Sequence, residues 1–227
     1  MKDVFLTTAN YHHFEELYNA LLGEQFGVEL GAVLGRAGRG KTTAAGRIYS
    51  TNGSAMLVRF EERLSPVGLL REITFAVAGT RPRTTQDCFD LLKEGLEDRH
   101  KLIMVDEADR MSIRHLNALR DLHDVFHTPI IFIGEEPLES KLRQERRLIS
   151  RLRDTVKFEP IGQADIVIFY KQGLDLGIPP EAAAKLARHA QGDFRLVVKD
   201  ALMIERIMRT SGEKALTEAI IEKACKA

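Results

Sequence analysis

The sequence of 227 residues contains no tryptophan, only two cysteines and no excess of charge of either sign. Cys88 and Cys225 lie far apart, without the spacing of a metal-binding motif, so neither a disulfide-stabilised scaffold nor a cysteine-based metal site is predicted. Because 33 basic residues balance 33 acidic ones, only a local cluster of charge could indicate a polyanionic partner. No apolar run is long enough for a signal peptide or a membrane span. These absences predict a cytoplasmic protein with no membrane partner.

The most informative segment that is present covers residues 35–42. It reads Gly-Arg-Ala-Gly-Arg-Gly-Lys-Thr and matches the complete G-x-x-x-x-G-K-[ST] phosphate-binding loop. The short apolar stretch 31–34 before it suits a buried strand, and residues 41–49 after it can form a helix, which is the context that this loop requires. The sequence therefore predicts a nucleotide site here.

Each part of this loop has an expected task. Glycines let successive backbone N–H groups turn toward an anion, and the N-terminus of the following helix adds partial positive charge. Lys41 is expected at the β- and γ-phosphates, and the hydroxyl of Thr42 on Mg²⁺. The predicted ATP-binding residues of the loop are Gly35, Arg36, Ala37, Gly38, Arg39, Gly40, Lys41, Thr42 and Thr43.

A second segment, residues 102–107, supplies the carboxylates that such a site needs. It reads Leu-Ile-Met-Val-Asp-Glu and places two acids at the carboxyl end of a predicted buried strand, where doubly wound sheets bind their ligands. Asp106 is expected to hold Mg²⁺ opposite Thr42, and Glu107 to polarise the water that attacks the γ-phosphate. This pair favours ATP hydrolysis over phosphoryl transfer to a small molecule.

Apolar strands alternate with helices over the first 160 residues. Strands are expected at 31–34, 55–60, 102–105 and 129–133, with a fifth candidate at 156–158, and helices at 14–22, 41–49, 66–78, 85–96 and 113–126. This alternation predicts an α/β fold with a mostly parallel sheet covered on both faces. Residues 164–226 show only helical periodicity, so we expect an α/β nucleotide-binding core over 1–160 and a lid subdomain of about four helices over 161–227.

The order of these motifs resembles that of the AAA+ ATPases, a class of P-loop NTPases. Residues 35–42 look like Walker A, residues 102–107 look like Walker B, and an all-helical lid follows. The resemblance implies a parallel five-stranded sheet flanked by helices, ATP and Mg²⁺ as cofactors, and assembly into an oligomer.

Two sensor positions follow from this resemblance. Residues 192–195, Gly-Asp-Phe-Arg, are similar to the sensor 2 motif, which implies that Arg195 contacts the γ-phosphate from the lid. Sensor 1 is expected near residues 134–136, where the chain departs from the usual neutral polar residue. Either Glu135 fills that position or no residue does.

An arginine finger follows from it as well. Residues 148–152, Leu-Ile-Ser-Arg-Leu, are similar to the segment that carries the finger into a neighbouring subunit's site. This implies a catalytic role for Arg151, with Arg147 and Arg153 as alternatives.

Within the AAA+ ATPases the chain resembles a narrower group, the transposition ATPases of the phage Mu B-protein type. The resemblance lies in residues 7–11, 31–35, 42–45, 106–109 and 132–135. It implies ATP-dependent assembly into a helical filament or a ring that binds duplex DNA without sequence preference, selects the transposition target and activates a transposase. Proteins of the Mu type usually carry an extra N-terminal helix-turn-helix domain, whereas here only about ten residues precede the expected ATPase, so nothing is carried over from that domain.

Two basic clusters could contact DNA. The loop at residues 79–85, Gly-Thr-Arg-Pro-Arg-Thr-Thr, offers Arg81, Arg83 and Thr84 for contacts with phosphates. The denser cluster at residues 141–153 is expected mainly at the subunit interface, because it overlaps the finger segment.

Other functions remain open. An ATPase of the same fold could serve secretion, signalling or the initiation of replication without a transposase. A P-loop kinase for small molecules is a further alternative, against which the adjacent Asp106 and Glu107 and the sensor 2-like segment argue.

Overall fold

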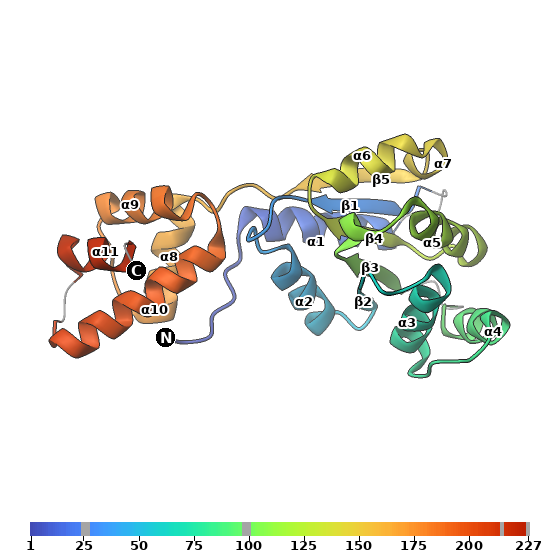
Figure 1. The fold of residues 1–227 in the computed structure, drawn as a ribbon, viewed down its shortest axis with the longest axis horizontal. Helices are drawn as coiled ribbons and strands as arrows, with labels where there is room; N and C mark the ends of the chain where they lie inside the picture. Colours follow the sequence, from blue (N-terminus) through green and yellow to red (C-terminus); the bar gives the residue numbers. More distant parts are fainter. Residues whose placement is uncertain (24–27, 97–100, 214–215, 226–227) are drawn as a thin grey trace. The chain divides into compact units, whose positions relative to one another are not determined.

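The computed structural model describes residues 1–23, 28–96, 101–213 and 216–225 (Figure 1). It contains one sheet of five strands in the order β2-β3-β4-β1-β5, in which every neighbouring pair is parallel. The strands are β1 (Leu30–Leu34), β2 (Ala55–Arg59), β3 (Leu102–Asp106), β4 (Ile130–Gly134) and β5 (Leu152–Lys157). The predicted α/β fold with a parallel five-stranded sheet is confirmed.

Burial follows this strand order. β1, β3 and β4 are buried at every residue, as their apolar sequences require in the middle of a covered sheet. β2 and β5 form the two edges and carry exposed residues. The sequence predicts the fifth strand only at 156–158, whereas β5 begins at Leu152. The reason is that Arg153, Asp154 and Thr155 interrupt the apolar run by which a strand is recognised.

Helices connect these strands. They are α1 (Ala9–Leu22), α2 (Lys41–Thr51), α3 (Pro66–Ala78), α4 (Thr85–Leu96), α5 (Ile113–Phe126), α6 (Pro137–Gln144) and α7 (Arg146–Ile149), with a 3-10 turn, η1 (Ala108–Arg110), after β3. The sequence predicts α1 to α5 but neither α6 nor α7. The charged residues of this segment mask a short apolar stripe, Leu138, Leu142 and Leu148, which is buried in the structure.

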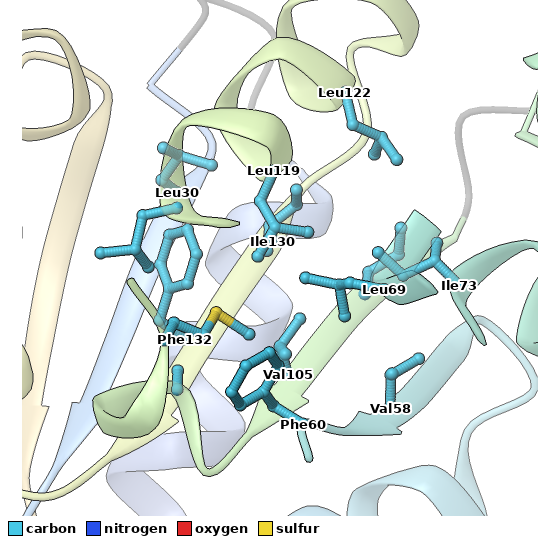
Figure 2. Close-up of a cluster of buried hydrophobic side chains, with 14 of the residues drawn as sticks. Leu30, Val58, Phe60, Leu69, Ile73, Val105, Leu119, Leu122, Ile130 and Phe132 are labelled. Carbon is cyan, nitrogen blue, oxygen red and sulfur yellow. The ribbon is translucent and has the colours of Figure 1, made fainter. Parts of the chain in front are cut away.

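Both faces of the sheet are covered. Leu30 and Phe132 belong to a buried cluster that includes Leu69 of α3 and Leu119 of α5 (Figure 2). Because successive residues of a strand point to opposite faces, Gly31 of β1 points away from that cluster. A Cβ atom at Gly31 would lie 2.8 Å from Leu21 Cδ1, so the missing side chain lets α1 approach the strand closely.

The chain divides into two compact units. One contains residues 10–36 and 41–158 and carries the sheet. The other contains residues 1–9, 37–40 and 159–227. Its helices are α8 (Gln163–Leu174), α9 (Pro180–Ala190), α10 (Phe194–Ser211) and α11 (Glu218–Cys225), which bury an apolar core of their own. The functional boundary at residue 160 stays a prediction.

The N-terminal residues belong to the second unit. Lys2 N donates a hydrogen bond of 2.8 Å to the carbonyl oxygen of Gly173 in α8, and the N-terminal ammonium group of Met1 pairs with Glu205 of α10 at 2.5 Å. None of the helices that the structure describes is both long and apolar enough to cross a membrane.

Candidate nucleotide site

The loop at residues 35–40 joins the carboxyl end of β1 to the first turn of α2. Gly38 and Gly40 have φ values of 77° and 88°, in the left-handed region that side chains disfavour. Because α2 begins at Lys41, the free N–H groups of its first turn adjoin the loop. This strand–loop–helix arrangement can bind an anion through backbone groups.

Lys41 is buried at this loop, with 9% of its surface exposed. Its Nζ donates hydrogen bonds to the carbonyl oxygens of Gly35, at 2.5 Å, and Arg36, at 3.0 Å. Burial lowers the pKa of Lys41, whereas four carboxylates act in the opposite direction. In order of their effect, these belong to Glu135, Asp106, Asp109 and Glu107. The ammonium group is therefore bound to the loop and also feels the charge of the acidic groups at and after the ends of β3 and β4.

Asp106, the last residue of β3, lies against the start of α2 and is 4% exposed. Thr42 Oγ1 donates a hydrogen bond of 2.8 Å to Asp106 Oδ2, and Glu107 N donates one of 2.9 Å to Asp106 Oδ1. Mg²⁺ is bound in proteins by oxygen ligands, which include carboxylates and, in phosphate-binding loops, the Ser or Thr hydroxyl. Because these two oxygens already adjoin, Thr42 and Asp106 are the residues here that could hold the ion, directly or through its waters.

Glu107 has the left-handed backbone conformation, with φ 60° and ψ 30°, which costs a residue with a side chain about 1–2 kcal/mol. Its carboxylate forms ion pairs with Arg59 Nη2 at 3.1 Å and Arg110 Nε at 3.2 Å. The side chains of these arginines are 68% and 50% exposed, so water weakens both pairs. Glu107 can therefore exchange them for a water molecule at little cost.

Asp109 of the turn η1 holds the segment after β4, a role that sequence analysis missed. Its Oδ1 accepts a hydrogen bond of 3.0 Å from Glu135 N, and a Cβ atom at Gly134 would lie 2.7 Å from the same oxygen. Lys141 Nζ donates to the backbone oxygens of Asp109 and Met111. The one available signal was the group of three acids within residues 106–109, which does not say which segment Asp109 contacts.

Residues 25–142 match the family model described as "AAA domain". The chain belongs to the AAA-domain family. It is 31% identical over 132 residues to a "Potential ATP-binding protein" of Staphylococcus aureus, over 54% of this chain and 49% of that protein. It is also 26% identical over 145 residues to the "ATP-dependent target DNA activator B" of Escherichia phage D108, over 60% of this chain and 46% of that protein. The chain thus spans about half the length of these curated relatives.

Solved structures share the fold of this AAA-domain chain. The ORC2 protein of Aeropyrum pernix superposes with a TM-score of 0.72 at 15% identity, over 100% of this chain and 70% of that one. The Holliday junction branch migration motor RuvB of Thermotoga maritima superposes with a TM-score of 0.65 at 18% identity, over 98% and 70% of the two chains. The identities are low, so these likenesses show the fold alone.

The sensor 2-like segment of the AAA-domain chain lies in the same compact unit as loop residues 37–40. Phe194 N donates a hydrogen bond of 2.8 Å to the carbonyl oxygen of Gly38, and Arg39 Nη1 donates one of 2.8 Å to that of Gly192. Arg195 N donates to Asp193 Oδ1 at 2.8 Å, which caps α10. The side chain of Arg195 lines a shallow hollow on α10 with Val198, Lys199, Leu202, Met203 and Arg206.

Arg151 of the finger-like segment binds within its own chain. Its Nε and Nη2 donate to the two carboxylate oxygens of Asp124 in α5, at 2.6 and 2.9 Å, and its Nη1 donates to the carbonyl oxygen of Arg147 at 2.7 Å. Arg147 is exposed on α7, and Arg153 lines a groove between β5 and α1. A finger role for Arg151 would require it to leave Asp124.

The loop between α3 and α4 has internal contacts that the sequence did not indicate. Arg81 donates to both carboxylate oxygens of Glu72, at 3.0 and 2.8 Å, and its guanidinium carbon lies 3.7 Å from the ring centroid of Phe75. Thr84 Oγ1 accepts a hydrogen bond of 3.1 Å from Asp87 N at the start of α4. Arg83 accepts a hydrogen bond from the guanidinium group of Arg71 through its backbone oxygen.

Proposed function

We propose that this AAA-domain chain hydrolyses ATP with Mg²⁺, assembles with further copies of itself on duplex DNA and presents that DNA to a transposase. The hydrogen bond between Thr42 and Asp106, beside buried Lys41, carries the ATPase part of the proposal. It joins the proposed metal ligands from two separate segments next to a loop that can bind phosphate.

In this proposal the phosphates of ATP replace the protein groups that Lys41 contacts. Oxygens of the β- and γ-phosphates take the place of the carbonyls of Gly35 and Arg36 as its hydrogen-bond acceptors. The glycines of the loop and the first turn of α2 donate backbone N–H groups to the same phosphates. Bound Mg²⁺ contributes positive charge that offsets the charge on the phosphate oxygens.

Glu107 then serves as the general base. After exchanging Arg59 or Arg110 for a water molecule, its carboxylate accepts a proton from that water while the oxygen attacks the γ-phosphorus. The bond between the γ-phosphorus and the bridging oxygen breaks, and ADP leaves. Arg195, in the predicted lid of residues 161–227, and Arg151 of a neighbouring subunit are proposed to stabilise the charge that develops. Glu135 is the proposed residue at the sensor 1 position.

The DNA part of the proposal rests on resemblance. The motifs of the chain resemble the transposition ATPases, and the matching phage protein is named a target DNA activator. Basic and hydroxyl side chains of the loop between α3 and α4 can bind phosphates without reading bases, which suits binding to any sequence.

One experiment tests both parts. ATP hydrolysis by the full chain is measured with Mg²⁺, alone and with duplexes of several unrelated sequences, and assembly is observed by electron microscopy with a slowly hydrolysed ATP analogue or ADP. We expect stimulation by every duplex and filaments on DNA with the analogue but not with ADP. Hydrolysis that DNA leaves unchanged would favour a secretion or signalling ATPase, and no hydrolysis under any condition would refute the proposal.

A further inference from the structure

Three helices of the C-terminal unit bring one side chain each to a common point. These side chains are His189 of α9, Asp200 of α10 and Cys225 of α11, and their nitrogen, oxygen and sulfur atoms all lie within 4.8 Å of one another. The three residues are not close in sequence and match no metal-binding motif, so only the packing of the helices assembles them.

The buried carboxylate of Asp200 is the part of this cluster that a cation would stabilise. Its side chain is 1% exposed; Oδ2 lies 2.8 Å from His189 Nδ1, whereas Oδ1 is enclosed and has no hydrogen-bond partner among the described residues. A buried carboxylate oxygen without a partner is costly. Lys185 of α9 does not relieve that cost, since its ammonium group pairs with Glu218 at 3.3 Å and Glu222 at 3.0 Å.

A second buried polar group belongs to the same region. The hydroxyl of Tyr170 in α8 is enclosed and also has no hydrogen-bond partner in the part of the chain that the structure describes. Burial, and after it the charges of Asp200 and Cys225, raises the pKa of Tyr170, so this neutral hydroxyl lies within electrostatic reach of both residues. The core of the C-terminal helices therefore contains unsatisfied polar atoms from both α8 and α10, and the one from α10 belongs to the cluster with the thiol and the imidazole.

We propose that His189, Asp200 and Cys225 bind a structural Zn²⁺ ion. Imidazole nitrogen, carboxylate oxygen and thiolate sulfur are the three ligand types that zinc takes in proteins. Bond lengths of about 2.0–2.3 Å in a tetrahedral site place ligand atoms about 3.3–3.8 Å apart, so shifts of about 1 Å would close this cluster on the ion. One carboxylate and one thiolate neutralise its charge.

Solvent can complete the site and also provides the path of entry. A water molecule can take the fourth position of the tetrahedron. The side chain of His189 is 34% exposed and Cys225 is partly exposed, so the ion can enter from solvent. Zinc would then join α9, α10 and α11 at one point and stabilise the helical unit, independently of ATP.

The test uses the full chain with any affinity tag removed. After treatment with a chelator, Zn²⁺ alone is titrated and the bound metal counted, and Co²⁺ is used as a spectroscopic probe of thiolate ligation. We expect one equivalent of Zn²⁺ per chain, a cobalt–thiolate charge-transfer band and a higher melting temperature with metal. Cys225→Ala should abolish the band and weaken zinc binding by at least about tenfold.

The matched control is Cys88→Ala, which removes the other cysteine, buried in α4 of the other unit. This variant should keep the cobalt band and the zinc affinity. If Cys225→Ala does not fold, His189→Gln replaces it as the test, because that side chain is partly exposed. The proposal would be overturned if the unmodified chain did not bind zinc. It would also be overturned if Cys225→Ala, or His189→Gln in its place, bound zinc as tightly as the control Cys88→Ala.

Discussion

The side chain of Thr42 donates a hydrogen bond of 2.8 Å to the carboxylate of Asp106, joining the first turn of α2 to the last residue of β3. Sixty-four positions separate the two residues in the chain. The contact exists because β3 lies in the interior of the parallel sheet, where its carboxyl end is level with the carboxyl end of β1. The loop that leads to α2 begins at that end of β1. It is the geometric basis for the predictions about the nucleotide site.

Lys41→Ala should abolish ATP binding in its productive geometry and reduce hydrolysis by at least about 100-fold, because it removes the buried point charge next to the loop. Nucleotide binding is measured with a fluorescent ATP analogue and hydrolysis by phosphate release. Lys93→Ala, at an exposed lysine of α4, is the control and should leave both unchanged. Normal hydrolysis by Lys41→Ala would rule out this site.

Glu107→Gln should bind ATP with nearly unchanged affinity but hydrolyse it about 10²–10⁴-fold more slowly, because the amide keeps the shape and loses the base. Single-turnover hydrolysis separates this step from binding. Arg110→Gln removes one ion pair of Glu107 and keeps its carboxylate, so it should retain most of the activity. A loss of less than a few-fold in Glu107→Gln would place the base elsewhere, and equal losses in both variants would indicate a structural role for the pair.

Replacing Arg81 and Arg83 together by Ala should weaken binding to all duplexes alike. The slope of log affinity against log salt should fall by about one unit for each lost phosphate contact. The control is Arg63→Ala, another exposed arginine that pairs with an acid on its own chain. Because Arg81 is held by Glu72, Glu72→Gln should release it and leave DNA affinity equal or higher. Unchanged affinity in the double variant would move the DNA surface to the basic cluster of residues 141–153.

Arg151→Ala should fold and bind ATP yet lose about 10³–10⁵-fold in turnover, if the residue acts across a subunit interface. Mixing it with Glu107→Gln should restore part of the activity, since each variant supplies the group that the other lacks. The contact with Asp124 provides the control: Asp124→Asn weakens the anchor within the chain and leaves Arg151 in place. Two results together would contradict this prediction: Asp124→Asn is as inactive as Arg151→Ala, and co-assembled Arg151→Ala and Glu107→Gln show no recovery of activity. Arg151 would then act within its own chain, and Arg147 would become the candidate for the arginine finger.

Gly134→Ala should lower the free energy of unfolding by about 1–3 kcal/mol, because a Cβ atom there would lie 2.7 Å from Asp109 Oδ1 and 2.8 Å from its backbone nitrogen. Gly46→Ala is the matched control in α2, where a Cβ atom meets nothing within 4 Å, and it should raise stability by up to about 1 kcal/mol. Urea unfolding of both variants gives the difference. Equal stability of the two variants would mean that the segment after β4 can move away from Asp109 at little cost in free energy, and that Asp109 does not hold it in place.

The sequence predicts the backbone of this protein well where the signal is local. Glycine spacing and a helix start define the loop at residues 35–42, and unbroken apolar runs define β1, β3 and β4. The apolar pattern fails at β5, on the edge of the sheet, because polar residues such as Arg153 and Asp154 are as typical of an exposed loop as of an edge strand. It fails again at α6 and α7, because each is too short for a periodic pattern to stand out from its charged residues.

The α/β class, the phosphate-binding loop and the acids at the end of β3 all follow from the amino-acid sequence alone, since each depends on patterns of residues that lie near one another along the chain. The polar groups that contact one another are evident only in the folded chain: Asp109 with Glu135 N, Arg151 with Asp124, and His189 with Asp200 and Cys225. These partners come from separate elements, and a hydrogen bond forms only within a range of donor–acceptor distances of about 0.5 Å. Such distances result from the packing of whole helices and strands, which no local pattern of residues encodes.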